Sequence, residues 1–306
     1  MSKTIDRNDA GGPEVSEEAK IMLDVGAVLN TVYLDIPYHS AHPLQTMDIL
    51  IPNNTAKPYP LMVYIHGGGW FFGDKRNIHT RSALKMAQAG YAVASINYRL
   101  SGENKWPAQI YDCKAAIRFL RANGEKYGIN TERIAVWGNS AGGHLAAMLA
   151  VTGGLPEFED MGMGNRDYSS SVEAVIVWFG GFNLTTPRND FVISKLFGYE
   201  NSMDNPLVCH ASPINHMKSG LPPMMIQHGL GDTVVSAEHA KVFYDRYIEN
   251  NGTEHIMLDL FKGQIHSGDM FHTDSNLRKI SAFLDQHIRQ ERRSTPPVFC
   301  EYPEIR

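Results

Sequence analysis

A regular alternation of strand-like and helix-like segments runs through most of the chain and constrains its fold more than any other feature. The run "LMVYIH" (61–66) is apolar over nearly its whole length, as expected for a strand buried on both faces of a sheet. The alternation that follows favours an α/β fold with a mostly parallel central sheet and helices on both faces. The further strands expected are 91–96, 133–137, 173–179, 223–229 and 255–261, and the helices are 79–90, 107–127, 141–152, 236–251 and 274–290.

The N-terminal part does not follow this alternation. We expect residues 1–30 to form a polar arm and then a helix over 16–30. Residues 31–36 and 45–51 follow as two strands, and the second alternates in the manner of a half-exposed antiparallel pair.

Two long segments interrupt the alternation further along. Residues 153–170 form a polar, glycine-rich loop, and residues 182–221 are punctuated by proline. Because long loops inside a compact domain are usually functional or disordered, we interpret 182–221 as a small cap over the site. A plain surface insertion is the alternative.

Composition and charge exclude several classes of protein. The length fits one large α/β domain, which we expect to span 1–306. A net charge of −5 leaves no broad basic field for nucleic acid or anionic lipid. No apolar run reaches the roughly 18 residues that a membrane helix needs, and the polar N-terminus has no secretory pattern. The three cysteines, Cys113, Cys209 and Cys300, fit neither a disulfide framework nor a metal site, so we expect a cytoplasmic protein with reduced thiols.

The stretch "AVWGNSAGGHLA" (135–146) places Ser140 between two glycines at a G-x-S-x-G spacing. An expected strand precedes it and an expected helix follows, which is the context that a nucleophile elbow requires. Gly138 and Gly142 lack side chains that would clash in so tight a turn. A helix-capping serine is the alternative, but the surrounding pattern favours a catalytic nucleophile.

The stretch "YIHGGGWFFGDKR" (64–76) supplies a second signal. Its glycines follow a buried strand, and their bare backbone can direct amides at an oxyanion. We assign the oxyanion hole to the N–H groups of Gly68, Gly69 and Ala141. A phosphate loop, the alternative, requires a Gly-Lys-Ser/Thr ending that this stretch lacks.

An acid and a histidine should follow such a serine in that order. Asp232 lies just after the strand expected at 223–229, and His266 lies just after the strand expected at 255–261. We expect Asp232 to orient His266, which acts as base and then as acid. His272 is the nearest competitor for the base, and His228 is interpreted as structural.

With HGGGW, GNSAGG, HGLGD and GQIH in this order, the chain resembles the α/β-hydrolase fold between about residues 30 and 290. It is most similar to the hormone-sensitive-lipase-like and feruloyl-esterase-like branches of carboxylesterases. The resemblance implies Ser140, Asp232 and His266 as the catalytic triad, with the oxyanion donors assigned above. Two residues depart from the family pattern: Asn139 stands where an acidic residue is common, and Ser267 where glycine is common.

The resemblance implies a serine carboxylesterase that needs no cofactor or metal and acts on a small-molecule ester, such as a short-chain acyl ester or an acetylated or feruloylated sugar. Trp70, Phe71 and Phe182 are expected to line the substrate pocket. Two alternatives stay open: a serine peptidase or amidase of the same fold, and a non-catalytic ligand-binding protein on a hydrolase scaffold. Neither nucleic acid nor membrane is expected as a partner, and a homo-oligomer is left open.

Overall fold

The computed structural model describes residues 3–6, 29–53, 57–77, 79–185, 191–198, 206–289 and 295–299. These residues form a nine-stranded sheet with the order β1-β2-β3-β5-β4-β6-β7-β8-β9. The strands are β1 (Lys3–Asp6), β2 (Leu29–Pro37), β3 (Thr46–Pro52), β4 (Tyr59–Ile65), β5 (Ala92–Ile96), β6 (Ile129–Asn139), β7 (Ala174–Trp178), β8 (Met224–Gly229) and β9 (Ile256–Phe261). The pairs from β1 to β3 and the β3–β5 pair are antiparallel, and every pair from β5 to β9 is parallel.

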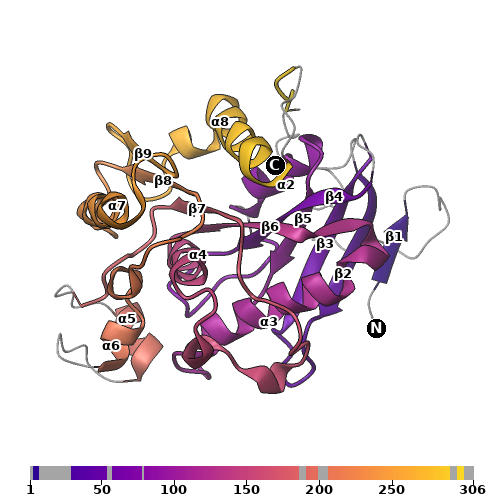
Figure 1. The fold of residues 1–306 in the computed structure, drawn as a ribbon, viewed down its shortest axis with the longest axis horizontal. Coiled ribbons are helices and arrows are strands. Elements are labelled where there is room, and N and C mark those ends of the chain that lie inside the picture. Colours follow the sequence, from indigo (N-terminus) through magenta and orange to yellow (C-terminus); the bar gives the residue numbers. More distant parts are fainter. Residues whose placement is uncertain are drawn as a thin grey trace.

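Helices cover both faces of this sheet. Figure 1 shows α2 and α8 on one face and α3 and α4 on the other. The helices are α2 (Thr80–Gln88), α3 (Ala108–Asn123), α4 (Ala141–Val151), α5 (Phe191–Phe197), α6 (Pro206–His210), α7 (Glu238–Asn251) and α8 (Asp274–Leu284). Short 3-10 turns are Gly124–Tyr127, Pro156–Phe158, Met161–Met163, Pro213–His216 and Asp269–His272, and a π turn covers Asp285–Arg289. None of the described helices is long and apolar enough to cross a bilayer.

Two hydrophobic cores lie on the two faces of the sheet, and the period of the strands explains the division. Along β4, Leu61 and Val63 belong to the core under α3, α4 and α7, whereas Met62 and Tyr64 belong to the core under α2 and α8. Successive side chains of a strand point to opposite faces, so a strand buried on both sides must be apolar throughout. The continuous apolar runs in the sequence therefore predicted the central strands correctly.

The N-terminal region differs from its expected form. Residues 3–6 form β1, which pairs with residues 31–34 of β2, although the sequence predicts only a polar arm there. Residues 29 and 30 belong to β2 rather than to a helix, and residues 16–28 of the expected helix lie outside the described residues. The sequence of β1, "KTID", is too short to show a strand period by itself, so the pairing with β2 decides its conformation.

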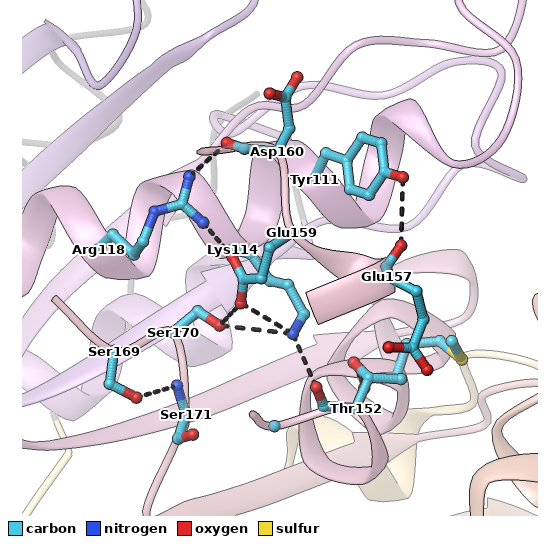
Figure 2. A network of polar contacts seen from close by, with 12 residues as sticks. Tyr111, Lys114, Arg118, Thr152, Glu157, Glu159, Asp160, Ser169, Ser170 and Ser171 are labelled. Atoms are coloured by element: carbon cyan, nitrogen blue, oxygen red, sulfur yellow. Dashed lines mark hydrogen bonds and ion pairs between the residues drawn. The ribbon is translucent and has the colours of Figure 1, made fainter. Parts of the chain in front are cut away.

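The glycine-rich loop after α4 is held by a buried ionic cluster (Figure 2). Lys114 and Arg118 of α3 are both fully buried and both pair with Glu159 of this loop. The Lys114 ammonium also donates to the Thr152 carbonyl at 2.8 Å, and the Arg118 guanidinium donates to the Asp160 carbonyl at 2.8 Å. Glu159 thus compensates two buried cations and ties the loop to the helix.

Replacing Glu159 with glutamine is expected to lower the free energy of unfolding by about 3 kcal/mol, since it leaves two buried cations without their counter-charge. Urea unfolding followed by circular dichroism measures this. Glu238→Gln is the matched control, because the Glu238 side chain is 64% exposed and pairs with Lys241 at the surface. The control is expected to change stability by less than about 0.5 kcal/mol; equal effects would contradict a special role for Glu159.

Candidate active site

Ser140 lies in a sharp turn between β6 and α4. Its backbone has φ 53° and ψ −118°, a conformation that L-residues rarely adopt. A Cβ on Gly138 would lie 2.1 Å from the carbonyl oxygen of Gly142, and a Cβ on Gly142 would lie 2.0 Å from that of Ile65. Both flanking positions therefore require glycine. The Ser140 amide donates to the Trp178 carbonyl at 2.9 Å, which fixes the turn to β7.

A hydrogen-bond chain joins Ser140 to His266 and Asp232, which follow the ends of β6, β9 and β8. The Ser140 Oγ lies 2.9 Å from the Nε2 of His266. The Nδ1 of the same ring lies 2.7 Å from the Oδ2 of Asp232. Since a carboxylate only accepts hydrogen bonds, Nδ1 carries the proton and Nε2 is free to accept from the serine hydroxyl. The arrangement can move a proton from the hydroxyl to the imidazole.

The surroundings of Asp232 favour its ionised form. Its Oδ1 accepts hydrogen bonds from the amides of Val234 and Val235, each at 2.8 Å. Burial alone would raise the pKa of Asp232, but the hydrogen bonds with His228 and His266, with that of the Val235 amide, hold its pKa well below the usual range. The carboxylate is therefore charged at neutral pH and can stabilise a protonated His266.

Sequence reasoning missed a contact between His228 and Asp232. His228 is fully buried, and its Nε2 lies 3.1 Å from the Oδ2 of Asp232 and 2.8 Å from the carbonyl oxygen of Val235. Both neighbours are acceptors, so Nε2 carries the proton. The Nδ1 has no hydrogen-bond partner among the described residues. The signal in the sequence is the spacing H-G-L-G-D, which puts His228 at the end of β8 and Asp232 one short turn later.

Asn139 joins the serine turn to the glycine-rich loop after β4. Its Oδ1 accepts hydrogen bonds from the Tyr64 hydroxyl at 2.7 Å and from the Gly67 amide at 3.0 Å. An acidic residue is common at this position in the resembled families, and an asparagine supplies the same acceptor without a buried charge. The contact fixes the start of the loop beside Ser140.

The three expected oxyanion donors line one cavity together with Ser140. Gly68 has φ 113°, and a Cβ there would lie 2.0 Å from the carbonyl oxygen of Phe72. Within the described part of the chain, the amides of Gly68 and Gly69 make no hydrogen bond. Ala141 is the first residue of α4, so its amide has no carbonyl one turn earlier to bond. These amides are available to a bound oxygen.

The cavity has a volume of about 560 Å³ and is largely apolar. Val192 and Ile193 of α5 form part of its wall, which brings the segment interpreted as a cap next to Ser140. Polar side chains of the wall include His79 and Ser267. The other apolar side chains are those of Trp70, Phe72, Phe179, Leu184, Val234 and Val235.

Of the three aromatic residues expected in the pocket, only Trp70 lines this cavity. Phe182 is fully buried and stacks on Phe243 of α7 with ring centroids 4.3 Å apart, so it belongs to the core. The Phe71 ring packs against Phe191 of α5 at 5.6 Å, and the next residue, Phe72, takes its place in the wall. The turn that follows Gly69 sends these two successive side chains in different directions.

His272, the alternative candidate for the catalytic base, lies beside α2. The Nδ1 of His272 lies 2.8 Å from the Ser82 hydroxyl of α2. Burial and the neighbouring His79 lower the pKa of His272 to about 4, so its ring is neutral at pH 7. His272 does not contact Ser140 or Asp232, whereas His266 contacts both.

Several known proteins with related sequences or structures are named as esterases. Esterase LipC of Mycobacterium tuberculosis is 30% identical over 255 residues, which are 80% of this chain and 62% of that protein. Esterase LipQ of the same organism is 32% identical over 220 residues, 68% of this chain and 51% of that protein. A solved structure, the truncated form of a carbohydrate esterase from gut microbiota, superposes with a TM-score of 0.80 at 28% identity and covers 85% of this chain and 97% of that one.

These comparisons settle fold and family. The chain spans about half to three fifths of the two curated relatives described above. Its sheet order and its likeness to the solved esterase show the α/β-hydrolase fold that the sequence motifs imply. The family model BD-FAE matches residues 47–247, more than half of the chain and most of the sheet, and the chain belongs to that family.

Proposed function

We propose that the protein is a serine carboxylesterase with Ser140 as nucleophile, His266 as general base and acid, and Asp232 as the orienting carboxylate. The observation that carries the proposal is the hydrogen-bond chain from Ser140 to Asp232, which opens into an apolar cavity beside unbonded amides. Esterase relatives support the same reaction class.

The proposed reaction has two halves. In the first, His266 takes the hydroxyl proton as the Ser140 Oγ attacks the ester carbonyl, and the amides of Gly68, Gly69 and Ala141 bind the oxyanion. The protonated His266 then gives its proton to the leaving alkoxide, which departs as the alcohol and leaves an acyl-enzyme. In the second half, His266 takes a proton from water, the resulting hydroxide attacks the acyl carbonyl, and the acid is released as Ser140 regains its proton. No cofactor enters either half.

The cavity supports a small substrate. A volume of about 560 Å³ lies within the usual range for small-molecule pockets and has to hold both the acyl and the alcohol part. We propose that residues 182–221 act as a cap, because Val192 approaches Gly69 so closely that a Cβ there would lie 2.6 Å from it. A short acyl chain fits under this wall. The cytoplasmic location remains an expectation from the sequence.

Hydrolysis of p-nitrophenyl acetate, butyrate and octanoate by the wild-type protein tests the proposal. We expect turnover of acetate and butyrate and a lower kcat/KM for octanoate, since the eight-carbon chain has to displace the cap residues. A folded wild-type protein that hydrolyses none of the three esters would contradict the proposed function.

We propose that His228 is a positioning residue for Asp232. His228→Phe keeps a ring in the space but removes the N–H donor, so the pKa of Asp232 is expected to rise and kcat to fall by about tenfold to a hundredfold. The loss of kcat is expected at every pH in the neutral range, because the pKa of Asp232 lies well below its usual range, and KM stays close to the wild-type value.

His228→Gln serves as the conservative variant, since its amide can still donate to the carboxylate. Stopped assays on p-nitrophenyl acetate across the pH range measure both variants. Partial recovery of kcat by glutamine is expected. Equal losses of kcat in both variants would assign His228 a packing role only.

A further inference from the structure

The chemistry proposed above fixes on which side of the cavity each half of the ester lies. His266 has to protonate the leaving oxygen, so the alcohol half of the substrate lies against His266. The carbonyl oxygen faces the amides of Gly68, Gly69 and Ala141. Groups of the cavity wall that adjoin His266 therefore meet the alcohol, and this inference rests on the proposed esterase reaction.

Two polar side chains of the wall adjoin His266, and they contact each other. Ser267 follows His266 in the chain, and its Oγ lies 3.4 Å from the Nδ1 of His79. His79 directly precedes α2 and lies 188 residues away in the sequence. Both line the cavity that contains Ser140. The fold thus places a hydroxyl and an imidazole together beside the group that protonates the alcohol.

The backbone of Ser267 lies in a conformation that is costly for a residue with a side chain. Its φ is 63°, in the left-handed region, where a residue with a Cβ costs about 1 kcal/mol more than glycine. Glycine is common at this position in the resembled families. The hydroxyl of Ser267 is the one polar group that this chain gains from having serine there.

His79 can act as a neutral hydrogen-bond partner of the Ser267 hydroxyl. Burial, and next the charge of His266, lower the pKa of His79, so its ring is uncharged at neutral pH and does not oppose the protonated His266. Its ring stacks on His272 with centroids 6.1 Å apart, which fixes its plane. A hydroxyl can donate to an imidazole nitrogen and accept at the same time, so the Nδ1 of His79 can take the Ser267 hydrogen bond and leave the lone pairs of Oγ for a substrate hydroxyl.

We propose that His79 and Ser267 form an alcohol subsite that binds a hydroxyl group next to the leaving oxygen, so that the preferred substrates are monoesters of 1,2-diols. The Ser267 hydroxyl donates to the Nδ1 of His79 and accepts from the substrate hydroxyl, so His79 orients the group that binds the alcohol. A vicinal hydroxyl is the position that fits, because Ser267 is the immediate neighbour of His266. Among the described residues of the wall, the other polar side chains outside the proposed triad are Asn77 and Asn139, and both already hydrogen-bond within the fold.

The test compares 2-hydroxyethyl acetate with propyl acetate, which differ by a hydroxyl in place of a methyl group. Each kcat/KM is divided by the rate constant for alkaline hydrolysis of the same ester, which removes the difference in chemical reactivity. The wild-type protein is expected to prefer 2-hydroxyethyl acetate about tenfold, the value of one or two hydrogen bonds at a half-exposed site.

Ser267→Gly removes the hydroxyl and places glycine at a left-handed backbone position, and His79→Phe keeps the stacked ring but removes the nitrogen that contacts the Ser267 hydroxyl. In both variants the preference is expected to fall to about onefold to threefold. His272→Phe is the control, because His272 belongs to the same ring stack but does not line the cavity. It is expected to keep the wild-type preference, and circular dichroism checks that each variant is folded.

A wild-type protein that hydrolyses p-nitrophenyl acetate but shows no preference between the two alkyl esters would overturn the subsite and leave the esterase proposal intact. Retention of the preference in Ser267→Gly and His79→Phe would overturn it as well. Absence of turnover on every ester would instead contradict the proposed function on which the subsite rests.

Discussion

Ser140→Ala is expected to lower kcat for p-nitrophenyl acetate by about 10⁶-fold, the scale found when a triad serine is removed. The alanine methyl group keeps the volume of the turn but has no oxygen to attack the ester. Because the turn itself rests on Gly138 and Gly142 and on the Ser140 amide, the fold is expected to stay intact.

Steady-state assays measure kcat of this variant, and urea unfolding checks that its fold is as stable as that of the wild-type protein. Ser169→Ala is the matched control, since Ser169 is an exposed serine in the loop after α4 and is expected to leave kcat within about twofold. Ester hydrolysis that persists in Ser140→Ala at more than about a hundredth of the wild-type rate would assign the nucleophile to another residue.

Asp232→Asn is expected to lower kcat by about 10⁴-fold with little change in KM. An amide at this position can donate to His266 Nδ1 and so favours the tautomer whose Nε2 carries a proton, which cannot accept from Ser140. The carboxylate charge that stabilises the imidazolium is lost as well. Since the pKa of Asp232 lies well below its usual range, the deficit relative to wild type is expected at every pH in the neutral range.

Asp245→Asn, an exposed substitution on α7, controls for the change of charge. Kinetics across the pH range, with substrate varied at each pH, separate kcat from KM. A loss of less than about tenfold in Asp232→Asn would mean that the carboxylate only supports the loop through the Val234 and Val235 amides.

The positions of the central strands and the mostly parallel sheet could be predicted from the sequence, because these strands are apolar on both faces. The carboxyl ends of parallel strands meet at one edge, so placing Ser140, Asp232 and His266 after three such strands predicted that they would lie together. The glycines around Ser140 also predicted the sharp turn. In the structure, a Cβ at either position would lie about 2 Å from a carbonyl oxygen, so no other residue fits there.

Contacts between side chains distant in the sequence could not be predicted in this way. Phe71 and Phe182 are aromatic residues near strand ends, yet packing against Phe191 and Phe243 takes both out of the cavity wall. Which side a ring faces depends on helices whose position the local pattern does not determine. The same holds for β1, whose conformation depends on pairing with β2.

The polar neighbours of the site show this limit most clearly. His228 contacts Asp232 because the loop between them folds back. The H-G-L-G-D spacing indicates that the two residues are near each other, but not which atoms meet. His79 and Ser267 meet because the start of α2 and the loop after β9 both lie beyond the carboxyl ends of the strands. Sequence patterns locate strands and turns well, whereas side-chain partners from different elements require the structure.

The most direct measurement of the central claim is mass spectrometry of the protein after reaction with a p-nitrophenyl alkylphosphonate, which phosphonylates an activated serine and releases p-nitrophenol. The account predicts one phosphonyl group per chain, located on the peptide that carries Ser140, with loss of ester hydrolysis in proportion to labelling. It also predicts no label in Ser140→Ala and much slower labelling in His266→Ala. A label on any other residue, or full inactivation with Ser140 unmodified, would contradict the assignment of Ser140 as the nucleophile.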